Sequence, residues 1–278
     1  MPYTILEKKE LAPNTVMMQI LAPLAVKKMR PGQFIIVRVT ANGERIPLSL
    51  SGWDTEKGTL RIIVQAVGRT STELINLNVG DSITDVVGPL GQASHMDKYG
   101  TCVLIGGGYG TGAIIPIARD LKALGNKVIA IIGARTKDLV LMEDELRTVC
   151  DRVEVSTNDG SSGVKGLVID VLSEILKKEP VHMVTAIGPV PMMKAVSEMT
   201  RPLNILTYVS LNAIMVDGTG MCGSCRVEIG GETKFACVDG PDFDGHKVNF
   251  DELVYRQKMY VPYEKKASEL YACKGGCK

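Results

Sequence analysis

The sequence lacks the features that would direct it to nucleic acid or to a membrane. Lysine and arginine number 32 against 31 acidic residues, so no charge excess is available to neutralise a phosphate backbone or an anionic lipid surface. Glycine, proline or charge interrupts the most apolar stretches well short of the roughly 18 residues that a membrane-spanning helix needs. The N-terminal "MPYTILEKKE" has no basic segment followed by an apolar core. We expect a cytoplasmic protein with no nucleic-acid or membrane partner.

Histidine is scarce, and internal repeats are absent. The three histidines, His95, His182 and His246, are scattered without the spacing of metal ligands. Cysteine, in contrast, is concentrated, because three of the seven cysteines fall within residues 222–237. An odd number with this clustering fits metal binding in a reducing compartment better than a disulfide framework.

The 278-residue chain is long enough for two or three packed domains. Residues 3–97 alternate short apolar runs with turn clusters, which predicts an antiparallel barrel or sandwich. From about residue 100, strands alternate with helices, including helices around 142–150 and 167–178, which predicts a doubly wound parallel sheet. After about residue 206 a segment rich in glycine and cysteine precedes an irregular, charged tail. We therefore predict a multi-domain β plus α/β protein divided into residues 1–97, 98–205 and 206–278.

A glycine turn follows the first strand of the predicted parallel sheet. In "GGGYGTGA", Gly108, Gly110 and Ala113 have the G-x-G-x-x-G/A spacing at the start of a helix. Small residues let the backbone approach a pyrophosphate, and the helix N-terminus offers free N–H groups. A tight turn without a ligand is the alternative. The next strand ends in "GAR" rather than in an acidic residue, which indicates a module other than the Rossmann dehydrogenase type.

Further loops carry weaker signals for anionic ligands. "AIGPVPMM", residues 186–193, lies at the carboxyl edge of the sheet, where open α/β folds bind ligands. In the first domain, "ERIPLSLSG" places Arg45 at a strand start, and "VGRTSTEL" sets a glycine and three hydroxyls before a short helix. Arginine and a helix start near Thr70 can both receive phosphate. A solvated Arg45 and a routine N-cap at Thr70 would equally fit these residues.

The cysteine segment has the spacing Asp217-x4-Cys222-x2-Cys225-x11-Cys237. Plant-type [2Fe–2S] loops follow C-x4-C-x2-C with a further cysteine downstream, so the aspartate occupies the first ligand position. A carboxylate is a harder ligand than a thiolate but can bind iron. Asp217 could instead begin a "DGTG" turn. In that case Cys102, Cys273 or Cys277 would supply the fourth ligand of the cluster. Alternatively, the cysteines would hold structural zinc.

The segments "RPGQF", "RIPLS", "GRTS", "GPLG", "GGGYG" and "GPVPMM" follow one another as in the ferredoxin-NADP reductase superfamily, which the first 205 residues resemble. The resemblance implies an FAD-binding β-barrel followed by an NAD-binding α/β domain. The implied FAD-binding residues are Arg45, Pro47, Leu48, Ser49, Gly68, Arg69, Thr70 and Ser71. The implied NAD(H)-binding residues are Gly107, Gly108, Gly110, Thr111, Arg135, Asp159, Gly188, Pro189 and Met192. The C-terminal aromatic that stacks on flavin in this superfamily has no clear counterpart.

A C-terminal cysteine cluster after these two domains resembles the electron-transfer subunit of dihydroorotate dehydrogenase, which normally carries four cysteines. The aspartate, with "GERIPLS" and "VSLNAIMVDGTGMCGSCRV", is more similar to the small (alpha) subunits of NADH-dependent reduced ferredoxin:NADP oxidoreductase, over roughly residues 1–255. This resemblance implies hydride exchange between NAD(H) and FAD, and single-electron exchange with a [2Fe–2S] cluster held by Asp217, Cys222, Cys225 and Cys237.

The same resemblance implies a heterodimer that bifurcates electrons. The expected partner is a larger flavin and iron–sulfur subunit related to the small subunit of glutamate synthase, with ferredoxin acting through the complex. We expect NADH rather than NADPH, because Ala134 precedes Arg135 where serine often stands in NADPH enzymes of this superfamily. The cofactors supply the chemistry, so no side chain is assigned a catalytic role. Three alternatives remain: a dihydroorotate dehydrogenase electron-transfer subunit, a hydrogenase or sulfhydrogenase diaphorase subunit, and a zinc-stabilised docking module.

Overall fold

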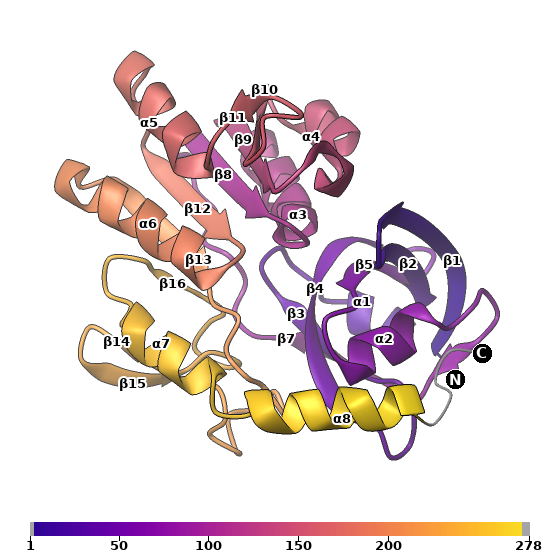
Figure 1. Cartoon of the computed structure of the whole chain (residues 1–278). Coiled ribbons are helices and arrows are strands. Elements are labelled where there is room, and N and C mark those ends of the chain that lie inside the picture. The colour runs from indigo at the N-terminus through magenta and orange to yellow at the C-terminus, as the bar shows by residue number, and fades with distance from the viewer. Residues whose placement is uncertain (1–2, 274–278) are drawn as a thin grey trace.

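The computed structural model describes residues 3–273, which form two seven-stranded sheets and a C-terminal region that contains a two-stranded sheet and packs against both (Figure 1). In Figure 1 the indigo barrel lies beside the magenta and orange parallel sheet with its helices. The yellow C-terminal helices lie below both, and the last one runs along the barrel. Among residues 3–273 the structure contains no helix whose length and hydropathy would let it span a membrane.

The first sheet is antiparallel, with strand order β6-β1-β2-β5-β4-β3-β7, and curves into a nearly closed barrel. Isoleucine, valine and methionine on its inner face form one core, which includes Met18, Ile35 and Ile62. The predicted barrel is thereby confirmed. Its elements are β1 (Tyr3–Ala12), β2 (Thr15–Leu21), α1 (Pro23–Val26), β3 (Phe34–Arg38), β4 (Arg45–Asp54), β5 (Thr59–Gln65), α2 (Arg69–Ile75), β6 (Ser82–Ile83) and β7 (Asp85–Leu90).

The second sheet has the order β11-β10-β9-β8-β12-β13-β16, and its strands are parallel except for β16. Fully buried β8 is central, and the chain returns through helices on both faces, as the alternating pattern predicts. The elements are β8 (Thr101–Gly107), α3 (Gly110–Ala123), β9 (Lys127–Ala134), η1 (Lys137–Leu139), α4 (Glu143–Val149), β10 (Arg152–Thr157), β11 (Val164–Lys165), α5 (Val168–Lys178), β12 (Met183–Ile187), α6 (Val190–Thr200), η2 (Arg201–Leu203), β13 (Leu206–Ser210) and β16 (Asp242–Asp244).

The C-terminal region is interlocked with the second sheet rather than separate from it, because β13 and β16 come from residues assigned by sequence to the third domain. It also contains β14 (Arg226–Ile229), β15 (Glu232–Phe235), α7 (Phe250–Gln257) and α8 (Val261–Cys273). The expected irregular tail is therefore wrong for residues 250–273. The Asn249 side chain accepts the Glu252 N–H at 3.1 Å and begins α7. The three-domain division itself stays a prediction.

The barrel and the parallel sheet are joined by an ion pair and a small apolar cluster. Arg61 of β5 pairs with Glu145 of α4, and its guanidinium also donates to the Ser51 carbonyl at 2.8 Å. Ile63 of β5 packs in one buried cluster with Leu141, which precedes α4. These contacts hold β5 of the barrel against α4 and the segment that precedes it.

Candidate functional site

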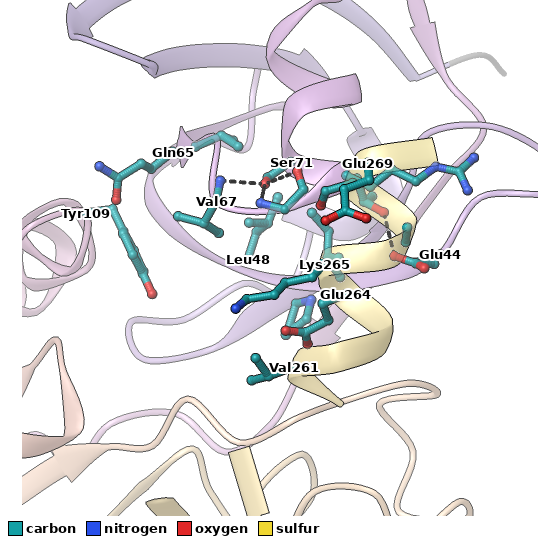
Figure 2. Close-up of a pocket in the computed structure, with 18 of the residues that line it drawn as sticks. Glu44, Leu48, Gln65, Val67, Ser71, Tyr109, Val261, Glu264, Lys265 and Glu269 are labelled. Atoms are coloured by element: carbon teal, nitrogen blue, oxygen red, sulfur yellow. Dashed lines mark hydrogen bonds between the residues drawn. The ribbon is translucent and has the colours of Figure 1, made fainter. Parts of the chain in front are cut away.

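The first cavity, of about 840 Å³, lies between β4, the start of α2 and α8 (Figure 2). Its volume is within the range of ligand pockets, roughly 300–1,000 Å³. The predicted FAD residues that line it are Pro47, Leu48, Gly68, Arg69, Thr70 and Ser71. Arg45 and Ser49 lie on the same strand but are exposed and outside the lining. The structure thus brings six of the eight predicted FAD residues to one cavity.

The loop before α2 is held in shape by its own side chains. The Ser71 hydroxyl oxygen accepts the backbone N–H groups of Val67 and Gly68, both at 3.0 Å, and Thr70 donates to Glu44 at 3.0 Å (Figure 2). A Cβ added at Gly68 would meet no atom within 4 Å, so the backbone there borders open space. These hydroxyls therefore shape the loop, while its exposed backbone is what a phosphate can approach.

A second cavity, of about 750 Å³, lies at the carboxyl ends of β8, β9, β10 and β12. Gly107, Gly108 and Pro189 line it, with Arg135 and Met192. Gly108 has φ of +57° and open space where a side chain would stand, so the turn presents bare backbone to the cavity. This is the feature that a dinucleotide pyrophosphate requires. The residues of this turn therefore fit a dinucleotide.

Four predicted nucleotide residues do not line this cavity: Gly110, Thr111, Asp159 and Gly188. A Cβ added at Gly110 would stand 2.4 Å from the Ile187 carbonyl oxygen, so this glycine permits close packing of α3 on β12. A Cβ at Gly188 would stand 3.0 Å from the Gly107 Cα, which makes Gly188 a spacer between the two turns. Thr111 is fully buried. Asp159 accepts the Ser161 hydroxyl at 2.7 Å, and this bond holds the pKa of its carboxyl below the usual range.

The two cavities meet at two residues that our sequence analysis did not single out. Gln65, at the end of β5, and Tyr109, within "GGGYG", line both of them. Figure 2 shows the Tyr109 ring at one end of the first cavity, next to Gln65. The position of Tyr109 within the glycine turn was a signal that could have identified it. Molecules bound in the two cavities would meet here, beside the tyrosine ring.

The cysteine loop is organised by the Asp217 carboxylate. Its oxygens accept the backbone N–H groups of Thr219 and Cys222, both at 2.8 Å, and these bonds lower the pKa of Asp217. The carboxylate thus closes the turn that carries the first two residues of the predicted ligand set. A hydrogen bond from Ser224 lowers the pKa of the exposed Cys222 thiol, which favours the thiolate that metals bind.

The other two candidate cysteines converge behind this loop. The sulfur atoms of Cys225 and Cys237 are 3.1 Å apart, and both residues are buried. Burial raises the pKa of Cys237 to about 12, so the free thiol keeps its proton near neutral pH, and a bound cation would have to displace that proton. Within residues 3–273 no three His, Cys, Asp or Glu side chains gather closely enough to hold a metal ion. Thiol and carboxylate donors are nonetheless a set that suits an iron–sulfur cluster, and two of the four predicted ligands, Cys225 and Cys237, lie close together.

Cys102, Cys273 and Cys277 are the alternatives to Asp217 as the fourth ligand, and the structure describes the side chain of Cys102 alone among them. Cys102 is buried in the core between β8 and α3, apart from the apolar cluster that includes Cys225 and Cys237. Burial among these apolar side chains raises its pKa to about 11, which is typical of a structural cysteine. The side chain of Cys273 and the whole of Cys277 lie outside the described residues. The structure therefore gives Cys102 no part in the cysteine loop.

Two segments of the chain match models of known protein families. Residues 2–95 match the family model of the oxidoreductase FAD-binding domain, and residues 212–249 match that of the iron–sulfur cluster binding domain of dihydroorotate dehydrogenase B. The dihydroorotate dehydrogenase B (NAD(+)) electron transfer subunit homolog of Thermotoga maritima is 43% identical over 267 residues, 96% of this chain and 94% of that protein. The corresponding subunit of Bacillus caldolyticus is 32% identical, covering 88% and 96%.

A solved structure is also similar over nearly the whole chain. It is a chain from a study of flavin-based electron bifurcation in NADH-dependent reduced ferredoxin-NADP oxidoreductase. That chain is 42% identical, covers 98% of both chains and superposes with a TM-score of 0.93. Together these matches confirm three predictions. The fold is as expected, the chain is a flavin-dependent NAD oxidoreductase subunit, and its cofactors are FAD, NAD(H) and an iron–sulfur cluster. The iron–sulfur match also disfavours the zinc docking module.

Proposed function

This chain belongs to the family of electron-transfer subunits that includes that of dihydroorotate dehydrogenase B, and from this premise we propose that it exchanges hydride between NAD(H) and FAD and single electrons with a [2Fe–2S] cluster. The observation that carries the proposal is the junction of the two cavities at Gln65 and Tyr109. When bound, the flavin supplies conversion between two-electron and one-electron transfer, and the cluster carries one electron at a time.

The residues of the chain bind and orient these groups. The Gly107–Gly108 turn and Pro189 would hold NADH in the second cavity, and the Gly68–Ser71 loop would hold FAD in the first. Contacts between the barrel and α4 connect the units that carry the two cavities, which would help to keep ligands bound in them aligned. Tyr109 forms the shared wall.

The cluster would be held by Asp217, Cys222, Cys225 and Cys237. Two observations support this set: the two buried sulfurs 3.1 Å apart, and the glycine-rich loop in which the Asp217 carboxylate lies next to Cys222 in space. Substituting Asp217 tests the carboxylate ligand. Because the carboxylate also accepts two backbone N–H groups, Asp217→Ala alone would confound loss of a ligand with loss of a turn.

The decisive experiment is anaerobic purification with iron, sulfide, zinc and flavin analysis and EPR of the reduced protein. We expect about two irons and two sulfides per FAD, as one [2Fe–2S] centre in each chain requires. Asp217→Cys should retain a cluster with an altered spectrum, whereas Asp217→Ala should lose or alter it. Asp239→Ala is the matched control, because Asp239 also accepts a turn N–H, from Phe235 at 2.7 Å, outside the motif. An unchanged spectrum in both Asp217 variants would exclude the aspartate ligand, and zinc without iron would exclude the electron-transfer function.

We further propose that the chain works in an electron-bifurcating, NADH-dependent ferredoxin:NADP transhydrogenase. The support is the 42% identity over 98% of both chains to the structure from that system, together with the aspartate in the first ligand position. The proposed partner is the larger flavin and iron–sulfur subunit related to the glutamate synthase small subunit. Copurification from the native host, followed by NADPH production from NADH and reduced ferredoxin, tests it. Activity without ferredoxin would contradict bifurcation.

A dihydroorotate dehydrogenase electron-transfer subunit is the second candidate, favoured by the family model at residues 212–249. Reduction of NAD⁺ by dihydroorotate in the native complex would establish this candidate and contradict the transhydrogenase. Nickel in that complex would instead indicate the hydrogenase or sulfhydrogenase diaphorase.

NADH is the proposed nucleotide in either complex. Arg135 lines the nucleotide cavity but has an exposed side chain, and no serine precedes it. Comparison of kcat/KM for NADH and NADPH tests the preference, and equal values would contradict it.

A further inference from the structure

The last helix of the structure, α8, forms one wall of the first cavity, which we call the flavin cavity after its proposed occupant. Its contribution to the lining is Val261, Glu264, Lys265, Ala267, Ser268 and Glu269. Figure 2 shows α8 crossing the cavity opposite β4 and the start of α2, with the Lys265 side chain extended into the space between Leu48 and Val261. The Arg69 guanidinium stands 6.0 Å from the centre of the Tyr271 ring, which ties α8 to α2. A segment about 200 residues away in sequence therefore closes the cavity made by the barrel.

The charges that face this cavity are unevenly matched. Three lining residues are acidic, Glu44, Glu264 and Glu269, and two are basic, Arg69 and Lys265. Arg69 is already paired with Glu73 of its own helix at 2.9 Å. Lys265, in contrast, makes no ion pair or hydrogen bond with another described residue. Lys265 is therefore the uncommitted cation among the described residues that line the cavity.

We propose that Lys265 binds the negatively charged pyrophosphate of FAD, and that α8 is the cofactor-retaining wall of the flavin cavity. The inference rests on the proposed function, since it takes FAD as the occupant. A dianionic pyrophosphate placed among three carboxylates would be repelled unless a free cation accompanies it. An ammonium on a flexible stem can meet a phosphate as a point charge without fixed geometry.

The next residue provides a matched control. Lys266 carries the same charge on the same helix and, like Lys265, is exposed, but it does not line the cavity. Successive residues of an α-helix point about 100° apart, so its ammonium is directed away from the cavity. Lys265→Gln and Lys266→Gln therefore change net charge and helix propensity equally. They differ because only Lys265→Gln removes a charge that lines the cavity.

The test is FAD release from the full-length holoprotein on serial dilution, followed by the fluorescence of free flavin, at low and high salt. We expect Lys265→Gln to raise the Kd for FAD about tenfold or more, and Lys266→Gln to change it less than about twofold. Lys265→Arg should restore most of the affinity, and the salt dependence of release should be weaker in Lys265→Gln because a screened charge pair is gone. With FAD in the same excess, thermal unfolding should show a lower midpoint for Lys265→Gln than for Lys266→Gln, because the stabilisation that a ligand gives falls as its Kd rises.

The outcomes separate this inference from the proposed function. Equal Kd values for FAD in the two glutamine variants, whether high or low, would overturn the role of Lys265. Such a result would leave the proposed flavoprotein function standing. Failure of Lys265→Arg to restore binding would overturn it too, because a positive charge is what the proposal requires. A wild-type chain that purifies without flavin and takes up none would instead overturn the proposed function itself.

Discussion

The nucleotide cavity and the flavin cavity are about the same size but are built in different ways. Glycine and proline turns at the ends of parallel strands line much of the former, and within these turns the backbone approaches the ligand site directly. The flavin cavity is closed by charged side chains on a helix from the far end of the chain. The residues of a site made of turns can be recognised in short sequence segments, whereas a site closed by a distant helix forms only when the chain packs into its tertiary structure.

The largest expected effect tests the packing under the nucleotide turns. Gly110→Ala would force a Cβ to within 2.4 Å of the Ile187 carbonyl oxygen, so α3 must shift from β12. We expect a loss of about 1–3 kcal/mol in unfolding free energy and a much higher KM for NADH. Denaturant unfolding and steady-state kinetics measure both.

Gly68→Ala, at the flavin cavity, is the control for this clash. Its φ is −150°, which any residue adopts, and the added methyl meets no atom within 4 Å. Its unfolding free energy should stay within about 0.5 kcal/mol of the wild-type value. Equal stability of the Gly110 and Gly68 variants would contradict the structural difference between the two cavities.

The wall that the cavities share gives the next largest effect. Tyr109→Ala should slow the reduction of bound flavin by NADH about tenfold, because the ring helps to align two ligands that meet beside it. Tyr109→Phe keeps the ring and should behave like the wild type. Anaerobic stopped-flow absorbance measures the rate. A slow phenylalanine variant would move the role from the ring to the hydroxyl.

A smaller effect is expected where the barrel meets α4. The side chains of Arg61 and Glu145 are 26% and 25% exposed, so their ion pair is partly shielded from water. A double-mutant cycle with Arg61→Met and Glu145→Gln should give a coupling energy of about 1 kcal/mol. Flavin reduction by NADH should slow in the same variants, because the ion pair connects the two cavity-bearing units. A coupling energy of zero would leave the alignment to the apolar cluster alone.

The smallest effect is expected at the sheet edge opposite the cavities. A hydrogen bond from Lys122 lowers the pKa of Asp151 below its ordinary value of 3.8. A lowered carboxyl pKa stabilises the fold above that ordinary value, and the stabilisation is lost as the pH falls through the lowered pKa. Asp151→Asn should cost about 0.5 kcal/mol near neutral pH, a small value because water reaches both side chains, and nothing in strong acid, where the carboxylate is protonated. Urea unfolding across pH measures it, and an equal cost at all pH values would contradict the electrostatic origin.

Local patterns predicted most of the fold and much of the site. The helices expected around 142–150 and 167–178 are α4 (Glu143–Val149) and α5 (Val168–Lys178), because their apolar spacing and flanking turns are local. The C-terminal helices were missed. A cap signal was present, since Asn249 stands three residues before Glu252, but α8 exposes most of its residues and has little apolar periodicity to reveal it.

The order of the structural units and the turns that approach ligands could be read from local sequence, since periodicity, glycine placement and cysteine spacing act over a few residues. Tertiary structure alone decided which predicted residues reach a cavity. It placed Pro47 on the flavin cavity and left Arg45 exposed, and it brought Lys265 beside Leu48. The physical reason is that burial and electrostatic environment depend on neighbours contributed by distant segments, which no local pattern encodes.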